Sequence, residues 1–142
     1  MPLQGNYLLS ANMDVAPEKE DLFNEVYDEE HVPAVLKVPG VLVAARFKTE
    51  ELTMMLGGER KTIVVEGEPK FSALYELESP DVMLSKEWAL ATELGRWPGE
   101  VRPYTANRHL LVTSVTANDA RPVSDYTVTQ LFGGLKATLG KL

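Results

Sequence analysis

The stretch Tyr27-Asp28-Glu29-Glu30-His31-Val32-Pro33, followed shortly by Val38-Pro39-Gly40, predicts where a helix gives way to a β-strand. A proline inside a helix removes a backbone hydrogen bond and clashes with the preceding turn, so we expect Pro33 to end or kink this helix. His31, one of only two histidines in the chain, is then expected in the last helical turn. From that position its side chain can face a cleft.

The elements on either side of this stretch follow from the spacing of apolar residues. Upstream, alternating apolar positions over residues 7–15 predict a strand. Pro17 and the acidic residues after it suit the first turn of a helix, because a negative charge is favourable at the positive end of the helix dipole. Downstream, β-branched content and length predict a second strand over residues 41–47, and we expect a third strand over residues 71–77.

The second half of the chain repeats the order of strand and helix. Ser79 is the expected N-cap of a second helix, with Pro80 at its first position. We expect Gly95 and Pro98-Gly99 to stop this helix, and a fourth strand within residues 102–115 that is best defined over 109–115. This order predicts an α+β protein, a ferredoxin-like βαββαβ fold with a four-stranded antiparallel sheet and two helices on one face.

Such a sheet leaves its other face without helices. Alternation along the strands puts apolar side chains on that face, namely Leu8, Leu42, Leu74 and either Leu110 or Leu111. A second copy of the chain is the simplest cover for them. We therefore expect a homodimer through the sheet face.

We assign residues 1–117 to this one domain and residues 118–142 to a C-terminal extension. Within the domain, residues 48–70 form an irregular insert or an extra hairpin, with a short strand over 61–66. The extension contains an apolar segment at residues 126–132 that does not suit a plain solvated tail. We expect the extension to pack on the domain or on the partner chain.

Composition argues against several classes of function. The 142 residues carry 14 basic and 21 acidic side chains, and the net charge of −7 disfavours nucleic acid as a partner. The absence of cysteine removes disulfides and cysteine-based metal sites and suits a cytoplasmic location. The N-terminus lacks the pattern of a secretory signal, and no apolar run approaches the ~20 residues that span a bilayer. We expect no membrane association.

His31 is the main candidate for acid or base catalysis, because an ordinary imidazole exchanges a proton near neutral pH. Asp28, three residues earlier, can share its helix face and orient the ring. Two plainer roles stay open: His31 as a cation at the helix C-terminus, or as a packing residue under the Pro-Gly turn.

Four further residues are candidates for binding a substrate. Arg46 and Arg108 stand in strands among apolar neighbours and suit an anion or a carbonyl group, unless each pairs with a carboxylate such as Glu76. Tyr75 and Trp88 suit an aromatic pocket, although their spacing is equally that of core residues.

The sequence suggests neither a cofactor nor a metal. Gly57-Gly58 lacks the strand and helix context of a phosphate-binding or dinucleotide-binding loop. Glu29, Glu30 and His31 are consecutive, and neighbouring helical residues diverge by ~100°, so they do not converge easily on one ion.

These residues together resemble the EthD-like branch of the dimeric α+β barrel proteins. The resemblance rests on the helix ending in Glu30-His31-Val32-Pro33, on Val38-Pro39-Gly40, on Leu74-Tyr75-Glu76-Leu77, and on Arg108 in the last core strand. It implies a homodimer whose sheets pack face to face, with a cleft between helix and sheet in each protomer. Relatives in the superfamily include cofactor-free monooxygenases, isomerases, polyketide cyclases, haem-degrading enzymes and stress-response proteins, so fold alone selects no chemistry.

Two hypotheses of different classes follow. In the first, the protein binds a small apolar or aromatic metabolite and uses His31 for cofactor-free acid or base chemistry of the isomerase, cyclase or monooxygenase type. In the second, it is a non-catalytic dimeric module that binds a ligand or responds to stress. The sequence leaves open whether the chain is an enzyme.

Overall fold

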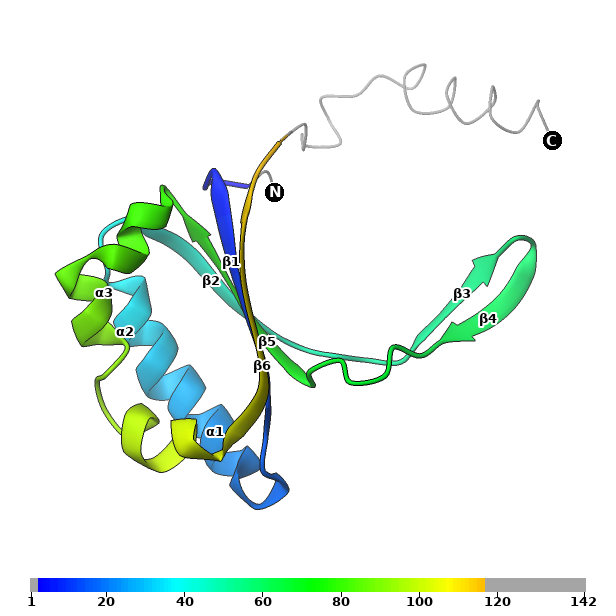
Figure 1. Cartoon of the computed structure of the whole chain (residues 1–142), viewed down its shortest axis with the longest axis horizontal. Coiled ribbons are helices and arrows are strands. Elements are labelled where there is room, and N and C mark those ends of the chain that lie inside the picture. Colours follow the sequence, from blue (N-terminus) through cyan, green and yellow to red (C-terminus); the bar gives the residue numbers. More distant parts are fainter. Residues whose placement is uncertain (1–2, 117–142) are drawn as a thin grey trace. The chain divides into compact units, whose positions relative to one another are not determined.

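One antiparallel sheet of four strands organises the structure, a computed structural model that describes residues 3–116 (Figure 1). Its strands are β1 (Tyr7–Val15), β2 (Val41–Lys48), β5 (Phe71–Leu77) and β6 (Thr105–Ser114), arranged in the order β2-β5-β1-β6. The first and third core strands are therefore central, which confirms the predicted ferredoxin-like arrangement. Residues 4–115 form one compact unit. The predictions for residues 118–142 lie outside the described residues.

The first helical segment continues past Pro33, so of the two predicted outcomes at this residue, an end or a kink, the end is wrong. The segment comprises η1 (Pro17–Lys19), α1 (Glu20–Val26), a π-helical turn η2 (Tyr27–His31) and α2 (Val32–Leu36). In the π turn the Val32 amide donates to the Tyr27 carbonyl, five residues back. Pro33 then falls in the first turn of α2, where its missing amide hydrogen is tolerated. His31 consequently lies in the middle of the helical segment and does not cap its end.

The second helical segment is divided into two short helices, and each has a serine as its N-cap. The Ser79 hydroxyl accepts a hydrogen bond from the Asp81 amide at 3.0 Å, but the element that it begins is the short η3 (Pro80–Leu84). Ser85 is extended and caps the six-residue α3 (Lys86–Ala91) through the Trp88 amide. Ser79 and Pro80 thus take the predicted positions, in a 3-10 turn.

The segment after α3 holds two more short turns, η4 (Trp97–Val101) and η5 (Arg102–Tyr104). Gly95, expected to stop the helix, has φ +67°. The fourth strand then begins at Thr105, four residues before the stretch where its pattern was clearest.

The insert between β2 and β5 forms the extra hairpin, with β3 (Leu52–Leu56) paired to β4 (Glu59–Ile63). Gly57 and Gly58 make its two-residue loop with φ of 63° and 81°. Positive φ at both loop residues is what a type I′ hairpin turn requires. The second strand of the hairpin lies slightly earlier than the predicted 61–66.

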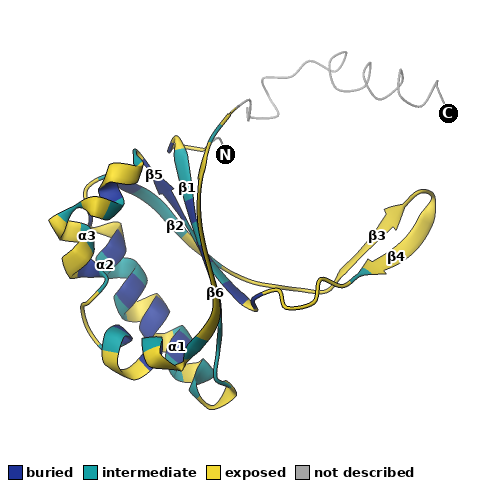
Figure 2. Ribbon diagram, viewed as in Figure 1, coloured by how far each residue is buried: buried dark blue, intermediate teal, exposed yellow. Residues whose placement is uncertain are grey.

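The core lies between the helices and one face of the sheet (Figure 2). Phe23 and Val26 from α1 are fully buried there, against inward residues of β1 and β5. No described helix is long and apolar enough to cross a membrane.

The opposite face of the sheet lacks a helical cover among the described residues. Leu8 and Leu74 are half-buried, whereas Leu111 is exposed. Leu110 pairs with the buried Ala11 and therefore lies on the helix side, so Leu111 is the outward member of the predicted pair. Leu42 lies at a β-bulge between Val41 and Val43.

Candidate functional site

A partly enclosed cavity of about 330 Å³ lies between the helical segments and the sheet. Four of the predicted site residues line it, namely His31, Tyr75, Trp88 and Arg108, which come from four different elements. Asp28 and Arg46 do not line it. The fold therefore brings together the histidine, the two aromatic residues and one of the two arginines.

His31 is held in this cavity by aromatic neighbours. Its side chain is buried, with 8% of its surface exposed. The ring stacks on Trp97 with centroids 4.5 Å apart and an angle of 26°, and it meets the Tyr27 ring edge-on at 5.2 Å. π-Helical turns are rare and are frequently found at functional sites, and this one contains both Tyr27 and His31.

The imidazole is neutral at physiological pH. Burial, and to a smaller extent the positive charge of Arg102, lower the pKa of His31 to about 4 against the opposing effect of Glu93. His31 is therefore neither a helix-capping cation nor a general acid at neutral pH. A neutral imidazole instead has one hydrogen-bond donor and one acceptor.

The surroundings of the two ring nitrogens differ. Nδ1 is buried with no hydrogen-bond partner among the described residues. His31 also lines the cavity, and its Nε2 is not among the buried atoms without a partner.

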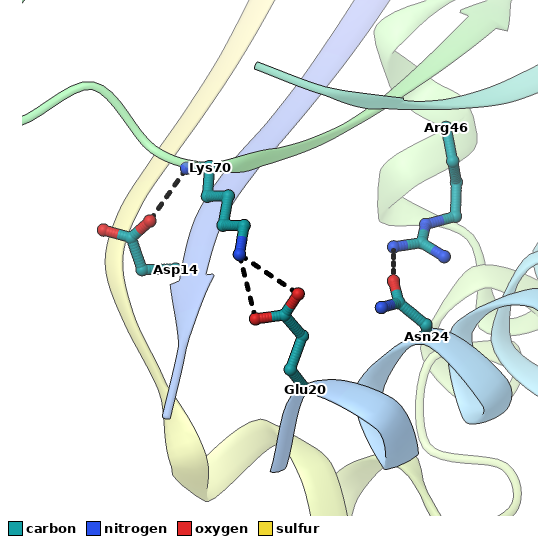
Figure 3. Close-up of polar contacts among 5 residues, drawn as sticks. All are labelled: Asp14, Glu20, Asn24, Arg46 and Lys70. Carbon is teal, nitrogen blue, oxygen red and sulfur yellow. Dashed lines mark hydrogen bonds and ion pairs between the residues drawn. The ribbon is translucent and has the colours of Figure 1, made fainter. Parts of the chain in front are cut away.

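Arg46 and Asp28 form a separate pair beside the helix. Arg46 Nη1 donates to Asp28 Oδ1 at 2.6 Å. Its Nη2 donates to Asn24 Oδ1 at 2.8 Å, as Figure 3 shows. The guanidinium lies 4.4 Å from the centre of the Tyr27 ring. Arg46 therefore has a carboxylate partner, but this is Asp28 and not Glu76. The expected hydrogen bond between Asp28 and His31 is not formed.

Arg108 reaches the cavity because of an irregularity in β6. The pairing with β1 runs from Asn12↔His109 to Asp14↔Ala106, so β6 carries one extra residue there. Asn107 adopts φ 50° at this bulge and donates to Asp14 Oδ2 at 3.0 Å. Bulges commonly redirect a side chain near a functional site. Arg108 makes no hydrogen bond or ion pair with any other residue of 3–116.

Two tyrosines, Tyr27 and Tyr75, line the same cavity. Burial raises the pKa of Tyr27 and that of Tyr75 above their ordinary values. A hydrogen bond between the two side chains lowers the pKa of Tyr27 and raises that of Tyr75. Both are therefore neutral. The Tyr75 ring also meets Trp88 edge-on at 6.3 Å, so Tyr75 and Trp88 contact each other as well as lining the cavity.

Trp97 is one of the cavity residues that sequence analysis missed, together with Tyr27 and Arg102, and Glu30 positions the loop that carries Trp97. The Glu30 carboxylate accepts from Arg96 Nε at 2.6 Å and from the Arg96 amide at 2.9 Å. These hydrogen bonds lower the pKa of Glu30. A Cβ on Gly95 would collide with that carboxylate. Glu30, from the acidic run before His31, therefore packs against Gly95 and binds Arg96. Local sequence patterns do not reveal this contact, because the residues are far apart in the chain.

Within residues 3–116, no group of three or more histidine, aspartate or glutamate side chains is arranged to hold a metal ion. Glu30, considered with Glu29 and His31 as a ligand cluster, is instead bound to Arg96.

No protein-family model matches the chain, and no curated protein matches it by sequence. Its structure is similar to the crystal structure of an EthD family protein from Bacillus halodurans C-125, with 13% identity and a TM-score of 0.50, covering 82% of this chain and 100% of that one. An MhuD variant with two manganese protoporphyrin IX molecules per active site aligns at 16% identity and a TM-score of 0.49, over 81% of this chain and 99% of that one. The haem degrader MhuD from Mycobacterium tuberculosis, with two haems bound, aligns at 16% identity and a TM-score of 0.45, over 80% and 99%.

At these identities the likeness concerns the fold alone. It confirms the predicted ferredoxin-like α+β class, and the first match agrees with the EthD-like resemblance seen in the sequence.

Proposed function

We propose that this chain, which has the ferredoxin-like fold, binds a small aromatic acid in the His31 cavity. The observation that carries the proposal is Arg108, an exposed guanidinium that makes no hydrogen bond or ion pair among the described residues and lines a cavity with mostly apolar and aromatic neighbours. A guanidinium that is not already paired is free to bind an anionic group of a ligand through two parallel hydrogen bonds. The volume of about 330 Å³ lies at the small end of ligand cavities, which suits a single-ring compound.

The neutral His31 supports the same class of ligand. Its neutral ring carries one N–H group, which donates a hydrogen bond to a ligand oxygen, while Arg108 binds the carboxylate or phenolate. Trp88 and Trp97 offer faces and edges for the ring of the ligand. Each group in the cavity then meets a chemically matched part of one small molecule.

The same two groups also suit catalysis without a cofactor, of the isomerase, cyclase or monooxygenase type. A neutral N–H donor and a guanidinium stabilise an oxyanion that develops in the substrate, which is commonly the largest contribution to catalysis. In this version Asp28 acts indirectly, by holding Arg46 against the Tyr27 ring. A non-catalytic ligand-binding module uses the same contacts without turnover.

Replacing Arg108 by glutamine is expected to weaken binding of benzoate about 10- to 100-fold, since a hydrogen bond to a charged group contributes ~1.5–3 kcal/mol. Binding is measured by calorimetry, with benzyl alcohol as the neutral comparison ligand. The same substitution at Arg60, which lies exposed on the hairpin, serves as the control and leaves benzoate affinity unchanged. Equal benzoate affinity in the Arg108→Gln variant contradicts the proposal, as does a preference of the native protein for benzyl alcohol.

We further propose that two copies pack their open sheet faces together. The support is the apolar surface on that face, which includes Leu74 and the exposed Leu111. Leu111→Glu is expected to yield a monomer in light scattering, whereas Leu84→Glu, at an exposed leucine of η3, leaves the native oligomer intact. A native chain that stays monomeric at high micromolar concentration rules the dimer out. The cytoplasmic location stays a prediction.

A further inference from the structure

Two arginines line the His31 cavity, and they differ in their partners. Arg102, the first residue of η5, faces the Glu93 carboxylate: its Nη1 donates to Oε2 at 3.0 Å, and its Nη2 lies 2.8 Å from Oε1. Nη2 also donates to the Thr92 carbonyl at 2.9 Å. Arg108 makes no such contact with any other residue of 3–116. The charge of Arg102 is therefore neutralised, whereas that of Arg108 is not.

The contact between Arg102 and Glu93 is bidentate, because both terminal nitrogens of the guanidinium face the two carboxylate oxygens. This geometry fixes the orientation of the arginine as well as compensating its charge. The hydrogen bond from Arg102 lowers the pKa of Glu93, so the carboxylate is ionised at neutral pH. The Arg102 side chain is 29% exposed and lines the cavity, whereas Glu93 is 55% exposed and does not line it. Glu93 thus holds the guanidinium from the solvent side.

The rest of the cavity lining contributes no charge at neutral pH. His31 is neutral because burial lowers its pKa to about 4. Tyr27 and Tyr75 are neutral because burial raises the pKa of each. The other lining residues have no ionisable side chain, apart from the two arginines. With Glu93 included, the cavity therefore has a net charge of +1.

We propose that the cavity selects aromatic acids with one negative charge over those with two, and that Glu93 sets this preference by neutralising Arg102. The inference rests on the function proposed above, in which Arg108 binds the carboxylate of an aromatic acid. A first carboxylate meets the unpaired guanidinium of Arg108. A second carboxylate finds no other unpaired cation among the lining residues, and an uncompensated charge in a mostly apolar cavity is costly.

Glu93 disfavours the second carboxylate in two ways. It occupies the two terminal nitrogens of Arg102 that a ligand carboxylate would use. Its own negative charge also repels a second anion that approaches Arg102. A binding site commonly achieves specificity through such a repulsive group as well as through its attractive contacts. Glu93 acts through Arg102 and does not itself touch the ligand.

A purely structural role for the same ion pair makes a different prediction. Glu93 follows α3 and Arg102 begins η5, so the pair joins two elements next to the cavity. If this is its only role, then removing the charge of Glu93 lowers stability and leaves the preference between ligands unchanged. The preference is therefore the measurement that separates the two roles.

Isophthalate and its monomethyl ester form a matched pair of ligands. They share the ring and the first carboxylate, and at pH 7 the acid carries two negative charges and the ester one. We expect the native protein to bind the monoester at least about 10-fold more tightly than isophthalate, a difference of the size that one hydrogen bond to a charged group contributes. Calorimetry at physiological ionic strength measures both affinities, with benzoate as the reference ligand.

Three variants test the assignment to Glu93. Glu93→Gln keeps the shape of the side chain and removes its charge, so the preference for the monoester is expected to fall about 10-fold as Arg102 becomes available. Glu93→Asp keeps the charge and is expected to keep the preference. Glu100→Gln changes the net charge of the chain by the same amount at an exposed residue of η4 outside the cavity lining. It leaves the preference within about twofold, because a distant surface charge is screened by salt. Circular dichroism verifies that the variants are folded.

The outcomes separate this inference from the proposed function. If benzoate binds no more tightly than benzyl alcohol to the native protein, both are overturned. If benzoate binds more tightly but isophthalate and its monoester bind equally well, the aromatic-acid site stands and the limit to one charge fails. An equal preference in the native protein and in Glu93→Gln also overturns the inference, since Glu93 then has a structural role alone.

Discussion

Replacing Trp97 by alanine is expected to lower the free energy of unfolding by about 3–5 kcal/mol, the usual cost of truncating a large buried aromatic side chain. Trp97 is 3% exposed, and its ring packs against three other aromatic rings. Its centroid lies 4.5 Å from that of His31, 4.8 Å from that of Tyr27 and 6.0 Å from that of Phe23. The substitution leaves a void that these neighbours fill only partly. Guanidinium unfolding with a fitted midpoint and slope measures the loss.

The same variant is expected to raise the pKa of His31 toward its ordinary value, because water gains access to the imidazole once the stacked ring is gone. An NMR titration of the His31 ring protons measures this. Trp97→Phe keeps an aromatic ring over the imidazole and is expected to show smaller changes in both stability and pKa. A Trp97→Ala variant with native stability, or with an unchanged His31 titration, contradicts the assignment of Trp97 as the residue that buries the imidazole.

Acidification from pH 7 to pH 5 is expected to cost about 2 kcal/mol of stability through His31 alone. The folded-state pKa of about 4 lies below the ordinary value of 6.5. Between these two values the unfolded chain binds a proton that the folded chain does not, so unfolding becomes more favourable as the pH falls. Above pH 7 both states are neutral at His31 and the penalty vanishes.

Urea unfolding at pH 7, 6 and 5 tests this expectation in the native protein and in His31→Phe, which keeps a ring against Trp97. The variant is expected to lose most of the pH dependence in this window. His109→Gln, at the exposed second histidine, is the control and keeps the native slope. The carboxyl groups with lowered pKa, Glu30 and Glu93, lose their stabilising effect only as the pH falls below about 4.5, so they do not interfere. A native slope in His31→Phe would show that other groups cause the pH dependence.

Local patterns predicted the elements whose causes are local. Alternation over residues 7–15 predicted β1 at its observed bounds, and the strand predicted over residues 71–77 is β5. The cap at Ser79 formed as expected because a side-chain oxygen and an amide two residues away meet without help from the rest of the chain. An extra hairpin was one of two alternatives predicted for residues 48–70, and Gly57-Gly58 form its turn.

Two departures from the expected arrangement concern Pro33 and Asp28. The rule for proline assumes a regular α-helix, whereas a π turn immediately before Pro33 carries the segment on to Leu36. Asp28 and His31 both lie in that turn, but Asp28 is exposed and His31 is buried. Asp28 pairs with Arg46 across the chain instead.

The sequence by itself determined the order of strands and helices, the α+β class and the identity of the unusual histidine, because periodicity, caps and turn residues act over a few positions. Only the tertiary structure decided that His31 shares a cavity with Trp97 and Arg108 and not with Asp28 and Arg46. These neighbours are remote in the chain and meet through strand register, one bulge at Asn107 and one carboxylate at Glu30. Contacts of that kind depend on the packing of the whole core, which local patterns do not encode.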